Sequence, residues 1–199
     1  MPGDGELTKL KSDVARMNRI VEQLLRVARL DAVGLDISGK VDLNAVGEAV
    51  VAAVAPLALT HDRTIAFLPA HPPVHVRGNA GAIEDAIRNL VENAIAHSMR
   101  HSEVCVEVGS DGSVSVADQG SGIAPEDRHR IFQRFWRAKG ASNGGADLGL
   151  AIVKEIADAH HATVSVDDNP LRQGTVFTIR FLLAVGRPRE AALAEAASM

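Results

Sequence analysis

Apolar residues near the start of the chain recur with the spacing of a coiled-coil helix. Between residues 7 and 30, steps of four and three separate Leu10, Val14, Met17, Val21, Leu24 and Ala28. Such spacing aligns apolar side chains in a heptad seam along one side of a helix. We therefore expect a helix that packs against a partner through this seam. The alternative is a helix that packs on its own domain.

A short linker follows this helix, and helix-like and strand-like patterns then alternate. Gly34 and residues 36–39 end the heptad pattern, so a second domain is expected to start near Val41. Its first helix has apolar positions at Val46, Val50, Val54 and Leu57. Residues 64–68 and 74–76 are predicted as short strands, because β-branched and other apolar residues dominate them.

The next helix carries a line of polar residues. Asn79 is its predicted N-cap, because an asparagine side chain accepts hydrogen bonds from the free amides at a helix start. The inward-facing residues are Ile83, Ile87, Leu90 and Ala94. Residues four apart share one helix face, and four polar residues do so here: Asp85, Asn89, Asn93 and His97. We interpret this line as the first functional surface of the domain.

The rest of the domain predicts two hairpins with a helix between them. Strands at residues 103–109 and 113–117 alternate in polarity and are joined by an Asp-Gly turn. Residues 148–160 form a third helix, and strands at 163–166 and 175–181 close the domain. The predicted fold class is α+β: a two-layer α/β sandwich in which three helices cover a mixed, mainly antiparallel sheet, preceded by the heptad helix.

Composition narrows the functional classes. Hydrophobic residues make up 46% of the 199 residues, and the net charge is −4 with scattered lysines and arginines. Nucleic-acid binding is therefore not expected. The one cysteine, Cys105, lies in an alternating strand and is interpreted as a small buried hydrophobe. No apolar run approaches the ~20 residues of a membrane span, and the first residues lack signal-peptide character. We expect a cytoplasmic location, with any inner-membrane anchor outside this chain.

Two asparagines on the polar line are candidate metal ligands. Asn89 and Asn93 lie four apart on one helix face, so both amide oxygens can point at the same ion. Neutral oxygens suit an Mg²⁺ ion that keeps water and phosphate ligands. The alternative is that both are ordinary surface residues.

A carboxylate at a strand end is a candidate for base recognition. Asp118 directly follows a predicted strand, and Gly120 and Gly122 come after it. Glycines allow a sharp turn and the close approach of a flat ring. The carboxylate can accept a hydrogen bond from an amino group on that ring. The same pattern is also typical of a simple turn.

Aromatic residues and arginines precede a segment that has few apolar side chains to pack in a core. Phe132, Phe135 and Trp136 bracket Arg134 and Arg137. The glycine-rich residues 138–146 that follow are interpreted as a mobile lid, with aromatics at its base and an arginine that reaches a phosphate. An aromatic cluster beside a disordered loop is the alternative.

Two more glycine positions complete the pattern. Gly149 lies in the first turn of the third predicted helix, where free amides and the helix dipole favour phosphate. Gly174 and Thr175 start the last strand, and they are either a turn or a wall of the same pocket.

Together these residues resemble the ATP-binding catalytic domain of sensor histidine kinases, a branch of the superfamily that includes type II topoisomerase, mismatch-repair and chaperone ATPases. The resemblance rests on four patterns in order: NLVEN at 89–93, DQGSG at 118–122, FQRF at 132–135 and GGADLGLAIVK at 144–154. The heptad segment resembles the second helix of the family's dimerisation and phosphotransfer hairpin. The resemblance implies three parts of the chain: the second hairpin helix with its linker (1–38), the ATP-binding domain (41–184) and a tail (185–199).

The resemblance implies an ATP-dependent protein-histidine kinase that uses ATP and Mg²⁺. It passes the γ-phosphoryl group to a histidine on a dimerisation helix and then to the receiver domain of a response regulator, within a homodimer. Asn93, with Asn89, would bind the metal, and the catalytic residues would be Asn89, Arg134 and Arg137. The implied nucleotide-binding residues are Asn89, Asn93, His97, Asp118, Gly120, Gly122, Phe132, Phe135, Gly145, Leu148, Gly149, Leu150 and Thr175.

Three departures from the family pattern keep a second function open. No histidine lies in the heptad segment, so the chain lacks its own phosphoacceptor. Asp147 stands where the family usually has a glycine, and Ala96 stands where relatives often place a basic residue on the phosphates. Both changes should weaken nucleotide binding. The alternative function is a degenerate ATP-binding or regulator-binding module without kinase turnover. A hydrolase is disfavoured, because hydrolytic relatives have a glutamate at the position of Asn89.

Overall fold

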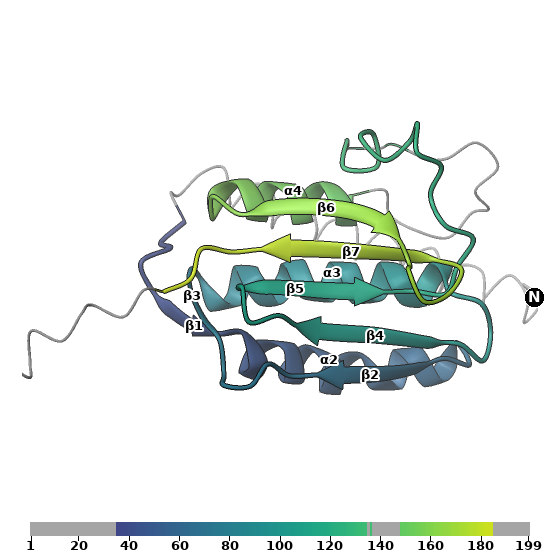
Figure 1. The fold of residues 1–199 in the computed structure, drawn as a ribbon, viewed down its shortest axis with the longest axis horizontal. Coiled ribbons are helices and arrows are strands. Elements are labelled where there is room, and N and C mark those ends of the chain that lie inside the picture. The colour runs from purple at the N-terminus through teal and green to yellow at the C-terminus, as the bar shows by residue number, and fades with distance from the viewer. Residues whose placement is uncertain (1–34, 135, 137–147, 185–199) are drawn as a thin grey trace, which may run out of the picture.

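Two layers form the part of the chain that the structure describes. This structure is a computed structural model, and it describes residues 35–134, 136 and 148–184. A five-stranded sheet forms one layer, and three helices cover one of its faces (Figure 1). The predicted α+β sandwich is therefore confirmed. The predicted heptad helix, the lid at 138–146 and the tail lie outside the described residues.

The sheet is mixed and mainly antiparallel, as predicted. Its strands are β2 (Thr64–Leu68), β4 (Glu103–Val108), β5 (Ser113–Ala117), β6 (Thr163–Asp168) and β7 (Thr175–Arg180). Their order is β2-β4-β5-β7-β6, and only the pair β2–β4 among these strands is parallel. β5 and β7 are therefore neighbours although they are far apart in the chain. This places the end of β5 beside the start of β7.

The three helices bury one apolar face each against this sheet. They are α2 (Leu43–Thr60), α3 (Ala80–His97) and α4 (Gly149–Ala159). The Asp42 side chain caps α2 by accepting from the amides of Asn44 and Ala45, and Asn79 caps α3 by accepting from the amide of Ala82. The four predicted inward residues of α3 are all fully buried. α3 lies between the other two helices behind the sheet (Figure 1).

The inward face of α2 differs from the prediction at its C-terminal end. Val50, Val54 and Ala58 are buried, whereas Leu57 is 38% exposed. Helical geometry turns each residue by about 100°, so Ala58, four after Val54, continues the buried stripe and Leu57 falls outside it. The described helices include one, α2, with the length and apolar composition of a possible membrane span. Glu48 interrupts the apolar residues of α2, so the sequence of this helix is not one unbroken apolar run.

A second, two-stranded sheet closes one end of the domain. β1 (Lys40–Asp42) pairs antiparallel with β3 (His75–Arg77), and the amide of Arg77 also donates to the carbonyl of Leu182. The start and the end of the described domain therefore meet on β3. β3 lies one residue later than predicted, and β1 was not predicted, because three residues are too few to show an alternating pattern.

Cys105 does not lie in the core, contrary to the prediction. Its strand neighbours Val104 and Val106 are fully buried toward the helices, so the pleat places Cys105 on the opposite face of the sheet. It is half-buried there. Partial burial and the nearby carboxylates of Glu107 and Glu103 raise the pKa of the Cys105 thiol. An alternating run fixes which residues share a face, but it does not show which of the two faces packs against the helices.

Candidate functional site

Asp118 is a buried carboxylate at the end of β5. Its side chain is only 3% exposed. Oδ1 accepts two backbone hydrogen bonds, from the amide of Gly120 at 2.7 Å and from the amide of Thr175 at 3.2 Å. The backbone amide of Asp118 in turn donates to the carbonyl of Thr175 at 2.8 Å. The pairing of β5 with β7 therefore brings Thr175, distant in sequence, to the carboxylate.

Two glycines leave room for this carboxylate. A Cβ atom at Gly120 would lie 2.6 Å from the carbonyl oxygen of His97, at the end of α3. A Cβ atom at Gly174 would overlap the carbonyl group of Asp118, and the Gly174 backbone has a φ of +138°. Both positions therefore require glycine. These contacts also show that the end of α3, the end of β5 and the start of β7 meet at one end of the domain.

The environment of Asp118 opposes its charge. Burial raises the pKa of the carboxyl, and the hydrogen bonds from Gly120 and Thr175 and the nearby His97 oppose that rise without cancelling it. A desolvated carboxylate that keeps one oxygen for a ligand is a strong acceptor, because nearby water does not compete. The site can therefore recognise a hydrogen-bond donor such as an exocyclic amino group.

Asn89 lies against the first turn of α4. It is 8% exposed, and its Nδ2 donates to the carbonyl oxygen of Asp85 one turn earlier at 2.7 Å. This bond orients the amide and turns Oδ1 toward Gly149, where an added Cβ would lie 3.1 Å away. The α3 and α4 helices therefore bring Asn89 and Gly149 together, as expected of one site. Leu148, the N-cap residue of α4, makes no side-chain cap.

The rest of the polar line extends from Asn89 toward Asp118. Asn93 is half-buried and His97 is exposed. Within the described part of the chain, nothing hydrogen-bonds to the Asn93 side chain. The nearby His97 lowers the pKa of the Asp118 carboxyl and so opposes the effect of burial. Asn89, Asn93 and His97 thus form a strip that connects the start of α4 with Asp118.

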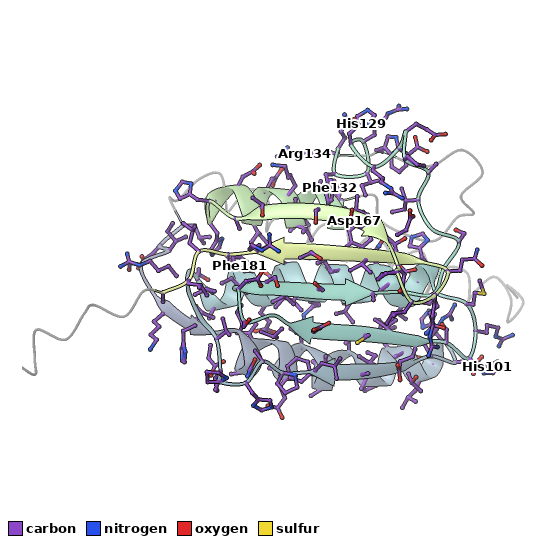
Figure 2. All side chains as sticks on the ribbon, in the orientation of Figure 1. His101, His129, Phe132, Arg134, Asp167 and Phe181 are labelled. Carbon is purple, nitrogen blue, oxygen red and sulfur yellow. The ribbon has the colours of Figure 1, made fainter. Side chains whose placement is uncertain are left out.

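The aromatic residues after β5 pack on the sheet and on α4. Phe132 makes an edge-to-face contact with the buried Phe177 of β7, with ring centroids 6.3 Å apart. Trp136 packs against the core. Arg134 pairs with Glu155 of α4, and its Nε lies 2.8 Å from the carboxylate. Figure 2 shows Phe132 and Arg134 beside α4 and β6. Two of the three predicted aromatics, Phe132 and Trp136, therefore pack on the core.

The remaining predicted residues divide into two groups. Gly122 has a φ of +79°, a backbone conformation that favours glycine, and Leu150 packs partly buried against the core. Four other residues of the sequence hypothesis lie outside the described residues: Phe135, Arg137, Gly145 and Asp147.

Sequence reasoning missed one residue at this site, Asn169. It lies in the loop between β6 and β7, and its Nδ2 donates to the carbonyl of Asp118 at 2.9 Å. The two residues are 51 positions apart. An Asn-Pro pair before the last strand signals a turn, but nothing local indicates which residue the asparagine contacts.

The described fold belongs to a known family of ATPase domains. Residues 78–185 match the family described as "Histidine kinase-, DNA gyrase B-, and HSP90-like ATPase", which is more than half of the chain. The chain therefore belongs to this family.

Individual relatives narrow the resemblance to one branch. The chain is 33% identical over 172 residues to sensor histidine kinase CpxA of Escherichia coli (strain K12), covering 83% of this chain and 37% of CpxA. It is 34% identical over 180 residues to sensor-like histidine kinase SenX3 of Mycobacterium tuberculosis (strain ATCC 25618 / H37Rv), covering 86% and 43%. The chain thus spans less than half the length of these relatives.

Solved structures agree. Full-length ShkA in complex with AMPPNP superposes with a TM-score of 0.72 at 28% identity, covering 92% of this chain and 39% of ShkA. The mycobacterial sensor histidine kinase MprB superposes with a TM-score of 0.62 at 29% identity, covering 73% of this chain and all of that one.

Proposed function

We propose that this chain binds Mg²⁺-ATP and is the catalytic part of a histidine protein kinase. The observation that carries the proposal is the buried Asp118 carboxylate, which the amides of Gly120 and Thr175 hold in place beside the strip on α3. Asp118 recognises the amino group of adenine, and Gly120 and Gly122 let the ring approach. Thr175 forms a wall of the same pocket.

The strip on α3 fits a hydrated magnesium ion. Asn93 and Asn89 offer two neutral amide oxygens four residues apart, and Mg²⁺ accepts such oxygens together with water and phosphate. Asn93 would be the main ligand, and Asn89 is held in orientation by its bond to Asp85. The ion would offset charge on the phosphates and keep the nucleotide in register with α4.

The start of α4 and the arginines before it hold the phosphates. The first amides of α4 have no cap from the Leu148 side chain, and glycine at position 149 lets the start of α4 lie close to Oδ1 of Asn89. Arg134 and Arg137 contact the terminal phosphate after ATP binds, which requires Arg134 to leave Glu155. Phe132, Phe135 and Gly145 complete the nucleotide-binding residues of this proposal.

The reaction that follows from this arrangement is phosphoryl transfer by positioning. The γ-phosphoryl group would pass from ATP to a histidine nitrogen: an N–P bond forms, the bond between the γ-phosphorus and the bridging oxygen breaks, and ADP is the leaving group. The acceptor histidine lies on a dimerisation helix outside this chain, in a homodimer. A response-regulator receiver domain then takes the phosphoryl group. We assign residues 41–184 to catalysis, 1–38 to the second hairpin helix and linker, and 185–199 to a tail. The domain works in the cytoplasm.

A second candidate is a module that binds ATP or a regulator without kinase turnover. Ala96 favours it, because this exposed position on α3 offers the phosphates no positive charge. Asp147 favours it too, because its carboxylate would repel phosphate from the start of α4.

Two measurements separate these functions. The first is calorimetric titration of the chain with ADP and a non-hydrolysable ATP analogue, with and without Mg²⁺. We expect micromolar binding that Mg²⁺ strengthens, and no binding up to millimolar nucleotide would refute the proposal. The second is transfer of labelled phosphate from ATP to a separate histidine-bearing hairpin. Binding without transfer would support the second candidate, and phosphate release without an acceptor would indicate a hydrolase.

A further inference from the structure

The loop between β6 and β7 is fastened to the backbone of Asp118. Asn169 begins this loop, and Gly174 and Thr175 end it. The Nδ2 of Asn169 donates to the Asp118 carbonyl at 2.9 Å, and the amide of Thr175 donates to Oδ1 of Asp118 at 3.2 Å. Both ends of one loop therefore hold the same residue, one through its main chain and one through its carboxylate.

The orientation of the Asn169 side chain is fixed by a second hydrogen bond. Its Oδ1 accepts from the backbone amide of Leu171 at 3.0 Å, in a turn of the kind that asparagine forms with the residue two positions on. Its backbone amide also donates to the carbonyl of Gly174 at 3.0 Å, which closes the loop. With Oδ1 occupied by an N–H donor, Nδ2 is the group that faces Asp118.

A parallel contact holds the residue after Asp118. Arg172, from the same loop, donates to Oε1 of Gln119 at 3.2 Å, and Nε2 of Gln119 donates to the carbonyl of Glu103 at 3.0 Å. The segment that carries the carboxylate is therefore held between this loop and β4. Asn169 makes the one side-chain contact of this loop that reaches Asp118 itself, among the described residues.

We infer that Asn169 is a positioning residue for base recognition: it fixes the backbone of Asp118 so that the free carboxylate oxygen points at the amino group of adenine. This inference rests on the proposed function. A buried hydrogen bond to a charged acceptor depends steeply on angle. A small rotation of Asp118 therefore costs the amino-group contact without emptying the pocket. Asn169 itself need not touch the nucleotide.

The substitution Asn169→Asp tests this idea with little change of shape. It retains an oxygen for the amide of Leu171, but it places an acceptor against the Asp118 carbonyl, where a donor is needed. Asn79→Asp is the matched control, because it adds the same charge at the start of α3 and, toward the described residues, the Asn79 side chain serves as an acceptor and not as a donor. A milder variant, Asn169→Ser, keeps a hydroxyl acceptor for the turn and loses the donor to Asp118.

Affinities for ADP and for purine riboside 5′-diphosphate, which lacks only the amino group, are compared by calorimetry or competition. We expect Asn169→Asp to weaken ADP binding roughly 10-fold and Asn169→Ser roughly 3-fold, with less than about a 2-fold change for the analogue. Asn79→Asp should change neither. If Asn169→Asp does not fold, as judged by circular dichroism, Asn169→Ser decides alone.

Two results would overturn the inference alone: equal losses for the two ligands, or no loss for ADP in a variant that folds. Failure of the unsubstituted chain to bind ADP at all would instead overturn the proposed function, and this inference with it.

Discussion

Replacing Gly174 with alanine should strongly destabilise the domain. A Cβ at this position would overlap the carbonyl oxygen of Asp118 and would lie 2.7 Å from its carbonyl carbon and 2.9 Å from Cα of Gln119. All three atoms belong to backbone, so no side chain can rotate away. The φ of +138° adds strain, because residues with a Cβ rarely adopt it.

The size of the effect follows from these two contributions. A sparsely populated backbone conformation costs about 1–3 kcal/mol, and forcing an extra methyl group into a packed site costs about 1–3 kcal/mol. Their sum is about 4 kcal/mol, a large part of the roughly 5–15 kcal/mol that stabilises a typical domain. At roughly 2–4 °C per kcal/mol for a chain of this size, the melting temperature should fall by about 10 °C.

The chain offers a matched control in Gly81→Ala. Gly81 lies exposed in the first turn of α3, and the nearest atom to an added Cβ there is Oδ1 of Asn79 at 3.5 Å. Alanine suits a helix better than glycine, so this variant should gain about 0.4–1 kcal/mol. Urea unfolding of the three proteins, followed by circular dichroism, measures both effects. A Gly174→Ala protein as stable as the Gly81→Ala protein would refute the reasoning.

Three further predictions concern single side chains. Asp118→Asn should retain or raise stability, because an amide oxygen accepts the same two backbone bonds without a buried charge, yet it should weaken ADP binding at least ~10-fold in calorimetry. Asp147→Gly should tighten ATP binding by removing a negative charge from the residue directly before Leu148; an unchanged affinity would contradict this. Burial lowers the pKa of His160, so the unfolded chain binds a proton more readily and stability should fall as pH drops from about 6.5 through the folded pKa. His160→Gln should flatten that dependence in urea titrations at several pH values, and substitution of the exposed His129 by glutamine should not.

The elements of the fold were predictable because their signals are local. The cap at Asn79 and the buried stripe that follows it identify α3, and the alternation before Asp118 identifies β5 within one residue. Errors arose where the choice depended on the phase of a repeat. Leu57 and Cys105 both lie in correctly predicted elements and both face the other way, because a one-residue shift moves a side chain to a different face.

The candidate site was predictable in its residue types and not in its contacts. Asp118 and the glycines after it are adjacent in sequence, so their turn could be anticipated. The contacts of Asn169 with Asp118 and of Arg134 with Glu155 join positions 51 and 21 residues apart. These contacts depend on the pairing of β7 with β5 and on how α4 packs in the domain. No local sequence pattern encodes either. Arg134 was expected at a phosphate, and the structure pairs it with a carboxylate on α4.

The charge of Asp118 itself argues for ligand recognition. A residue that only closed the turn between β5 and Gly120 would need one oxygen to accept two amides, and asparagine would supply it without the cost of burying an anion. The chain instead places a carboxylate where burial raises its pKa, and it surrounds that carboxylate with glycines that no side chain can replace. Such a cost is offset when a donor such as an amino group enters the pocket and pairs with the free oxygen. The stability that this buried charge costs is therefore the consequence expected of a binding site. Measuring both the stability and the ADP affinity of Asp118→Asn tests this argument.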